Sequence, residues 1–397
     1  MSWADLGSAA LRAALPLAVW GCGAAAYAAA EEVADGMIVG ASAVRVRIPF
    51  RRPFVTAAGT WHERDAWIVR LRASDGRVGA GEAGLDPAAD VPTLDRLAVT
   101  VRDAIASLDR SDDLAGWLRP DEAGAPDPIT LSVRAAIGGA ALDLGLVTLD
   151  GASPSPTVAV NATIATEDAE ASVAEARRAV EDGFTTIKLK GGLERSTDEL
   201  VGRLAAVRDA VGPRIAIRLD VNGAWDPATA RDRLAGLAAI HLEYVEQPIP
   251  AGDVAALARV RAESPVPIAA DESVASLSAA RALLAAGAAD VLVVKPGRVG
   301  GPSMAHAIAC EAEAAGVGIT ISTLLETGVG LAAALRVAAC FPDRAHGLAT
   351  ADVLASDLLT TRLAIRDGRM SVPSDRCLGL DEAALDRFAI ERIGSVR

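Results

Sequence analysis

Short apolar segments alternate with helix-length stretches over residues 185–296. Five segments are rich in β-branched residues and end on polar side chains, at 185–190, 215–222, 242–248, 266–273 and 290–296. The stretches between them are rich in Ala, Leu and Arg and are long enough for a helix. Strands that alternate with helical patterns are typical of βα units, which build parallel sheets.

Similar segments extend this pattern in both directions. Residues 157–163 predict a first strand, a helix follows over 166–182, and residues 318–322 and 345–348 predict the seventh and eighth strands. Eight such strands favour an α/β fold, a TIM-like (β/α)8-type barrel that includes the (β/α)7β variant. In these barrels the active site lies at the carboxyl ends of the strands.

The pattern before the barrel predicts a smaller α+β capping domain. Apolar residues alternate with period two at 44–48 and 67–71, a turn at 73–77 closes a hairpin, and helices are expected over 93–118 and 129–150. Residues 49–61 and 81–87 are expected to be loops. The predicted division is a capping domain at 37–150, a barrel at 151–350 and a segment at 351–397 that returns to the capping domain through a hairpin near 363–370.

Residues 1–36 form an N-terminal extension of unclear role. Its apolar run is interrupted by Arg12 and Pro16, which argues against a membrane span. A weak signal peptide, a surface helix and a translation start assigned too early are the alternatives. We favour the last, because Met37 directly precedes the first strand-like segment.

Five charged residues occupy matching places at the ends of the strands. Lys190, Asp220, Glu246, Asp271 and Lys295 follow one another at intervals of 30, 26, 25 and 24 residues, each about the length of one βα unit. Three carboxylates would then surround a metal ion, with an amine on each side. The alternative is a set of ordinary salt bridges at strand ends.

The residue types indicate which metal and which base. Asp220, Glu246 and Asp271 offer only oxygen ligands, which favour Mg²⁺ over Zn²⁺. Lys188 shares a strand face with Lys190, so each ammonium should lower the pKa of the other and make one a general base. A pair of anion-binding lysines is the alternative.

Neighbouring polar residues complete the predicted site. Asn222 shares a face with Asp220 and is a candidate supporting residue, and Arg218 lies on the same face one layer deeper. Glu272 is expected to point away from the metal. A substrate carboxylate on the metal would have a more acidic α-proton, and Lys295 would act as a second acid/base or as a fixed cation.

Composition limits the classes of partner and compartment. The chain of 397 residues has 51% apolar and 23% charged residues and a net charge of −13, which disfavours nucleic acid as a partner. Its four cysteines lack CxxC spacing and read as reduced thiols, so we expect a cytoplasmic protein. The expected partner is a small-molecule carboxylate, without a membrane, and a homo-oligomer is left open.

The strand-end motifs resemble those of the enolase superfamily, muconate cycloisomerase subgroup. The motifs that carry the resemblance are Lys188-Leu189-Lys190, Asp220-Val221-Asn222, Glu246-Gln247-Pro248, Ala270-Asp271-Glu272-Ser273 and Lys295-Pro296. The resemblance covers residues 38–395. It implies a barrel with a capping domain whose loops close over the substrate, an acid/base pair of Lys190 and Lys295, and Mg²⁺ bound by the three acids.

Two further stretches are most similar to o-succinylbenzoate synthases. They are 160–164 and 322–330, and the second begins with Ser322 and Thr323, which become candidate substrate-binding or supporting residues. This resemblance implies a carbon–oxygen lyase of menaquinone biosynthesis that eliminates water from a cyclohexadiene carboxylate. Lys190 would move the proton, and Lys295 would stabilise the intermediate.

Other activities on the same scaffold stay open. N-succinylamino acid racemases share these second motifs. Dipeptide epimerases usually carry Asp-x-Asp near the eighth strand, where this chain has only Asp352. A barrel that has lost catalysis and only binds a partner is the alternative from another class, and the complete set of lysines and acids argues against it.

Overall fold

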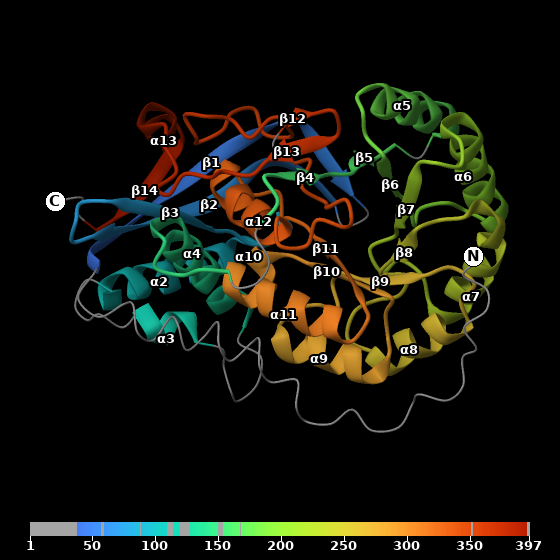
Figure 1. Cartoon of the computed structure of the whole chain (residues 1–397), viewed down its shortest axis with the longest axis horizontal. Coiled ribbons are helices and arrows are strands. Elements are labelled where there is room, and N and C mark those ends of the chain that lie inside the picture. The colour runs from blue at the N-terminus through green and yellow to red at the C-terminus, as the bar shows by residue number, and fades with distance from the viewer. Residues whose placement is uncertain are drawn as a thin grey trace.

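The computed structural model describes residues 38–56, 59–87, 89–108, 114–119, 127–149, 154–166, 168–350 and 352–394. The predicted extension at 1–36 lies outside these ranges. The described chain forms an antiparallel sheet with its helices and a curved parallel sheet that helices surround (Figure 1). The fold class is the predicted one.

The antiparallel sheet has the strand order β14-β1-β2-β3. Its strands are β1 (Ile38–Thr56), β2 (Gly59–Ala73), β3 (Val78–Ala83) and β14 (Ala389–Ile393), and its helices are α2 (Val91–Leu108), α3 (Leu114–Leu118) and α4 (Pro128–Leu144). Side chains alternate between the two faces of β2. Trp67 and Leu71 pack with α2 and α4, whereas Ala66 and Ile68 pack with the C-terminal part of the chain.

The prediction of a long loop at 49–61 is wrong. β1 and β2 continue through most of this region as a two-stranded ribbon, in which Phe54 pairs with Trp61 and Thr56 with Gly59. The register shifts between Pro49 and Phe54, where prolines interrupt the ladder. The period-two pattern is lost there, which explains why the pattern alone favoured a loop.

The parallel sheet has the strand order β11-β10-β9-β8-β7-β6-β5, so sequential strands are neighbours. The strands are β5 (Ala162–Ile164), β6 (Thr186–Lys190), β7 (Ala216–Asp220), β8 (Tyr244–Glu246), β9 (Ile268–Ala270), β10 (Val291–Val294) and β11 (Gly318–Ile321). The helices on its outer side are α5 (Ala169–Glu181), α6 (Thr197–Val211), α7 (Pro227–Gly236), α8 (Val254–Glu263), α9 (Leu277–Ala286), α11 (Pro302–Ala314) and α12 (Gly328–Ala338), with the short α10 (Pro296–Val299) and the 3₁₀ turn η1 (Ala238–Ile240).

Each of the first five barrel helices begins after a capping side chain. Asp168, Ser196, Asp226, Asp253 and Ser276 accept hydrogen bonds from backbone amides of the first helical turn. Such a cap stabilises a helix by about 1 kcal/mol. These residues therefore fix where each βα loop ends and where the next helix starts.

The eighth strand position closes the ring without a regular strand. His346 bridges Val160 and Gly347 bridges Ser322, both in parallel orientation. The buried His346 ring also accepts from the Ile321 amide at 2.9 Å through Nδ1 and lies 2.9 Å from the Phe341 carbonyl through Nε2. The predicted strand over 345–348 is thus reduced to two bridges and a histidine side chain.

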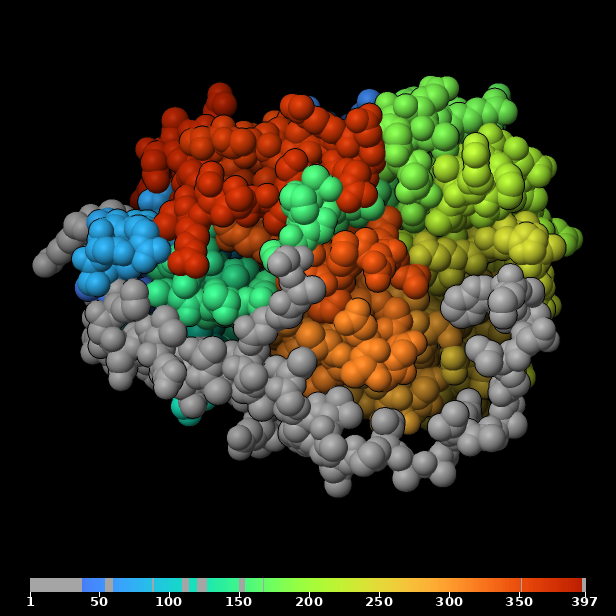
Figure 2. Space-filling view, viewed as in Figure 1, coloured from blue at the N-terminus to red at the C-terminus, as the bar shows by residue number. Residues whose placement is uncertain are grey.

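The predicted first strand at 157–163 is divided in two. β4 (Thr157–Ala159) pairs antiparallel with β13 (Arg369–Ser371), which pairs with β12 (Ile365–Arg366), and only β5 joins the parallel sheet. The hairpin near 363–370 therefore pairs with β4 and not with the antiparallel sheet. The chain then forms α13 (Glu382–Phe388), and β14 pairs with β1. Figure 2 shows this C-terminal segment lying against both parts of the molecule.

None of the helices in the described ranges has the length and apolar character that a bilayer crossing requires.

Candidate active site

The ends of five neighbouring strands place the predicted charged residues on the inside of the barrel. Lys190, Asp220 and Glu246 are the last residues of β6, β7 and β8 and lie in register. Asp271 and Lys295 directly follow β9 and β10. Alternation turns Leu189, Leu219 and Val245 outward into the core beneath the helices, so the charged neighbours point inward.

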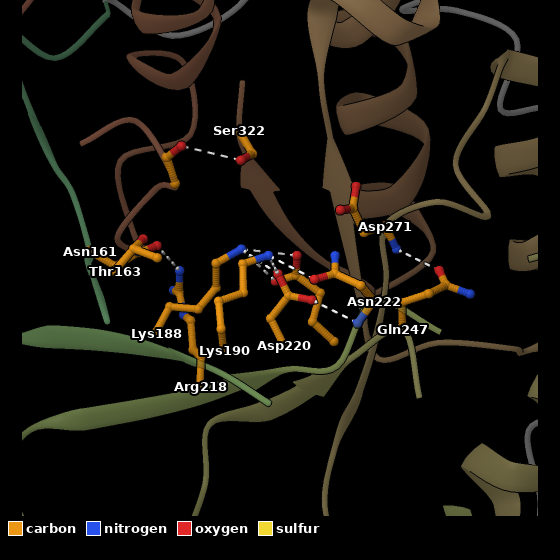
Figure 3. A network of polar contacts seen from close by, with 12 residues as sticks. Asn161, Thr163, Lys188, Lys190, Arg218, Asp220, Asn222, Gln247, Asp271 and Ser322 are labelled. Carbon is orange, nitrogen blue, oxygen red and sulfur yellow. Dashed lines mark hydrogen bonds and ion pairs between the residues drawn. The ribbon is translucent and has the colours of Figure 1, made fainter. Parts of the chain in front are cut away.

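The two lysines of β6 converge on one carboxylate (Figure 3). Lys190 Nζ donates to Asp220 Oδ2 at 2.7 Å and to Asn222 Oδ1 at 2.9 Å. Lys188 Nζ donates to the same Asp220 oxygen at 2.9 Å and to Glu246 Oε1 at 3.1 Å. Lys188 therefore sits deeper, between two carboxylates, and Lys190 is nearer to the mouth.

The opposite wall carries a second basic pair. Lys295 Nζ donates to Asp271 Oδ2 at 2.6 Å, and Arg298 Nη1 donates to Asp271 Oδ1, also at 2.6 Å. Arg298 lies in α10 and was missed by the sequence reasoning. Its position three residues after Lys295, at the start of a helix that begins with Pro296, is the signal that could have found it.

Glu272 faces the site, contrary to prediction. Its Oε1 accepts from Asn222 Nδ2 at 3.0 Å. β9 ends at Ala270, and the Val274 amide donates to the Asp271 carbonyl in a turn, so strand alternation no longer applies at Glu272. Burial first, and then the charge of Asp271, raise the pKa of Glu272.

Buried charges shift the carboxyl groups in opposite directions. Burial alone would raise the pKa of Asp220, but the ammonium groups of Lys188 and Lys190 hold it well below its usual range. Burial and the neighbouring Asp220 charge raise the pKa of Glu246. In Asp271, Lys295 and Arg298 overcome burial and lower the pKa.

The expected lowering of a lysine pKa is not found at Lys188. Burial alone would lower the pKa of this ammonium, but the carboxylates of Asp220 and Glu246 outweigh burial and raise it well above the usual value. Repulsion between the two lysines would lower the pKa, but the attraction of the acids between them is stronger.

Asp220, Glu246 and Asp271 carry the oxygen donors that a hard cation prefers. In this structure the lysine ammonium groups hold these carboxylates in place. In the described part of the chain, no three acidic, histidine or cysteine side chains are already arranged as a metal site. The three carboxylates are nonetheless almost completely buried, and the charges of Asp220 and Asp271 both raise the pKa of Glu246. Buried oxygen donors that repel one another fit Mg²⁺ in donor type, and Asp220, Glu246 and Asp271 would hold it.

The remaining predicted residues lie at different depths. Arg218 is fully buried in register with Lys188, one layer below Lys190, where its donors are used by Glu243, Asn161 and the Ala345 carbonyl. Ser322 Oγ donates to the Gly347 carbonyl at 3.2 Å, and the Thr323 and Thr350 hydroxyls are 3.1 Å apart. Ser322 and Thr323 thus follow β11 at the closure of the ring, while Arg218 fills the barrel below.

Two family descriptions match most of the chain. "Mandelate racemase / muconate lactonizing enzyme, N-terminal domain" matches residues 38–147, and "Enolase C-terminal domain-like" matches residues 171–383. The chain belongs to the enolase superfamily. Members of this superfamily generally use Mg²⁺.

Known superfamily members are similar over different lengths. An o-succinylbenzoate synthase of Thermobifida fusca is 42% identical over 52% of this chain and 64% of its own length, just under two thirds of that relative. A chloromuconate cycloisomerase of Pseudomonas sp. strain P51 is 32% identical over 85% of this chain and 94% of its own.

Solved structures of the superfamily show the same fold. Muconate lactonizing enzyme from Pseudomonas fluorescens, complexed with muconolactone, superposes with a TM-score of 0.79 at 28% identity, over 89% of this chain and 99% of its own. Epimerases and racemases of the superfamily also match. The relatives are enzymes acting on small molecules, and they divide between lyase and isomerase names.

Proposed function

We propose that this superfamily member is a Mg²⁺-dependent, o-succinylbenzoate synthase-like dehydratase. The proposal depends mainly on one observation, the two lysine amines on opposite walls of a group of buried carboxylates. The 42% identity to an o-succinylbenzoate synthase over 212 residues supports this chemistry, while identity to a chloromuconate cycloisomerase is 32% over 352 residues. The substrate class is a carboxylate with a hydroxyl group β to it.

The proposed reaction assigns separate tasks to the two walls. Bound by Asp220, Glu246 and Asp271, Mg²⁺ would stabilise the negative charge that develops on the substrate carboxylate. Lys190, as the free amine, takes the α-proton and becomes an ammonium. It then gives that proton to the departing hydroxide, so that water leaves and a carbon–carbon double bond forms. Lys295 stays protonated on the opposite face and offsets the charge of the intermediate.

The roles within the β6 pair follow from position. Lys188 donates to two carboxylates and its side chain is 11% exposed, whereas that of Lys190 is 21% exposed. Lys190 is therefore the better placed of the two to reach a substrate from the mouth. Lys188 is assigned to holding Asp220 and Glu246 in place.

An N-succinylamino acid racemase or dipeptide epimerase is the second candidate. Lys295 is held by a single carboxylate, as Lys190 is held by Asp220, and each amine could therefore exchange a proton on its own face. A racemase needs both lysines to move protons, whereas the dehydratase needs only Lys190.

Lys295→Arg separates these reactions, because arginine keeps the positive charge but cannot serve as a base at neutral pH. We expect the variant to retain measurable dehydration of a hydroxylated cyclohexadiene carboxylate, and Lys190→Arg to lose at least 10³-fold. The measurements are loss of the diene absorbance and α-proton exchange of N-succinylamino acids in D₂O. If Lys295→Arg stops all turnover while exchange persists from one face, the racemase is favoured. Turnover by the wild type that EDTA does not abolish would contradict the metal assignment.

A further inference from the structure

A buried ion pair lies where the antiparallel sheet meets the barrel, outside the candidate active site. Glu82 is on β3 and Arg64 on β2, and their side chains are 0% and 1% exposed. Arg64 Nη2 lies 3.6 Å from Glu82 Oε1. Burying such a pair costs several kcal/mol per ion unless other hydrogen bonds compensate.

On the barrel side, Glu82 caps α12, one of the helices that surround the parallel sheet. Its Oε2 accepts from the Thr327 amide at 2.9 Å, from the Thr327 hydroxyl at 2.6 Å and from the Gly330 amide at 3.3 Å. Thr327 is the N-cap of α12, and a carboxylate at this end also complements the helix dipole. α12 follows the segment that leaves β11 at Ser322, so Glu82 is tied to the rim of the barrel mouth.

On the other side, Arg64 holds residues 84–87. Its Nη1 donates to the Leu85 carbonyl, and its guanidinium lies so close to Gly84 that a Cβ there would be 2.1 Å from Nη2. The Ser132 hydroxyl of α4 donates to the Gly84 carbonyl at 3.2 Å. The segment that follows β3 is therefore fixed over the arginine by contacts on two sides.

Residues 84–87 are connected to the candidate active site through α4. Ser132 of α4 holds the Gly84 carbonyl, and α4 packs against α10, the short helix that follows Lys295 and carries Arg298. A continuous path therefore leads from α12 through Glu82, Arg64, residues 84–87 and α4 to the wall that carries Lys295.

Stability alone does not explain why this pair is charged. Within the described residues, Glu82 Oε1 and Arg64 Nε and Nη2 have no hydrogen-bond partner, although all three atoms are buried. Apolar side chains of similar size often replace such a pair at no cost to stability. The contacts that are made all fix one backbone segment relative to another.

We propose that Glu82 and Arg64 are positioning residues that lock residues 84–87 of the capping sheet to the start of α12 and so set one side of the substrate site. This role rests on the proposed function only for its kinetic readout. Neither residue touches the reacting atoms.

Glu82→Gln tests the proposal, because its single amide oxygen can keep the bonds from Thr327 and Gly330 only if the amide nitrogen, which is a donor, faces Arg64. The matched control is Arg336→Met. Arg336 also lies on α12, but near its C-terminal end. It donates to Asp143 of α4, a helix that packs on the antiparallel sheet, at 3.1 Å. Each variant disturbs one polar contact at the junction between the same two parts of the molecule.

Hydrogen exchange of the peptide covering residues 83–90 is the readout that needs no substrate. We expect Glu82→Gln to exchange at least tenfold faster there, with a KM about tenfold higher and a smaller change in kcat, while Arg336→Met stays within twofold in all three. Both variants should lower the melting temperature. If Glu82→Gln lowers the melting temperature but leaves exchange and KM unchanged, the residue is only structural and the proposal is wrong.

A second variant covers the case in which Glu82→Gln does not fold. Arg64→Lys keeps the charge next to Glu82 but lacks the fork that reaches Leu85 at the same time. It should loosen residues 84–87 in the exchange experiment, and unchanged exchange would again overturn the proposal. If no tested carboxylate is turned over by the wild type, the proposed reaction fails, while the exchange comparison still decides the positioning role.

Discussion

At the residue scale, Gln247 shows how one amide side chain fixes the ends of two strands. Its Oε1 accepts from the Asp271 and Ser273 amides at 3.0 and 3.1 Å, and its Nε2 donates to the Ile249 carbonyl and the Ser273 hydroxyl at 2.9 and 2.8 Å. Gln247 is 1% exposed and has a positive φ of 43°. A non-glycine residue holds this conformation only where its surroundings impose it.

Gln247→Met therefore tests how firmly the acids are held. Methionine fills a similar volume but makes none of the four hydrogen bonds. We expect Mg²⁺ to bind 10- to 100-fold more weakly in calorimetry, because Asp271 loses its backbone support. Asp290→Asn is the control, since Asp290 joins Arg261 and the Ile268 amide at the opposite end of β9. If the control weakens Mg²⁺ binding equally, general loss of stability explains both results.

At the element scale, two β-bridges and the buried His346 side chain take the place of the eighth strand of the barrel. Burial lowers the pKa of His346 to about 4, because a charged ring would lack solvation and its Nδ1 would lose the amide of Ile321. The folded state therefore binds this proton less readily than the unfolded chain, whose histidine has a pKa of 6.5. The contribution of the neutral ring to stability is present above pH 6.5 and is lost as the pH falls toward 4.

His346→Asn should remove this pH dependence. At pH 7 the variant should be less stable by about 1–3 kcal/mol, because buried partners lose hydrogen bonds. Between pH 7 and pH 5 its unfolding free energy should fall less than that of the wild type, as measured in urea. His241→Asn is the control, since His241 is exposed and already has a positive φ that asparagine tolerates. Equal pH slopes in His346→Asn and the wild type would contradict this account.

The strands themselves were predictable because their causes are local. Period two, β-branched residues and helix caps lie within each segment, and six of the eight predicted barrel strands formed as parallel strands of one sheet close to their predicted places. The ribbon at 49–61 and the split at 157–163 were missed, because partners elsewhere in the chain determine them. The Phe50 bridge to Leu354 and the pairing of β4 with β13 are two examples.

At the scale of the whole molecule, the basic residues are unequally distributed by type. Only three of the 39 lysine and arginine residues are lysines, and all three lie in the candidate active site as Lys188, Lys190 and Lys295. Everywhere else the chain uses arginine. Arginine supplies a permanent charge, whereas a lysine can lose its proton and act as a base. This usage supports a need for amines at these three places.

Amine-selective acetylation should therefore inactivate the enzyme with very few modifications. The sequence contains only three lysine amines besides the α-amino group. Lys190 should react first, because its side chain is 21% exposed, whereas those of Lys188 and Lys295 are 11% and 12% exposed. Loss of turnover should follow acetylation of Lys190 in peptide mass spectra. Full activity in a sample with Lys190 completely acetylated would exclude it as the base.

The sequence by itself determined the order of strands and helices and which lysines and acids stand at the strand ends, because alternation and spacing are properties of neighbouring residues. Only the tertiary structure decided which groups those charges meet. Gln247 and Glu272 entered the site through turns that no period describes, Arg298 entered it through the short helix α10, and the acids around Lys188 reversed the expected shift of its pKa. The contact between Glu82 and Thr327 joins residues 245 positions apart, a distance over which no local pattern carries information.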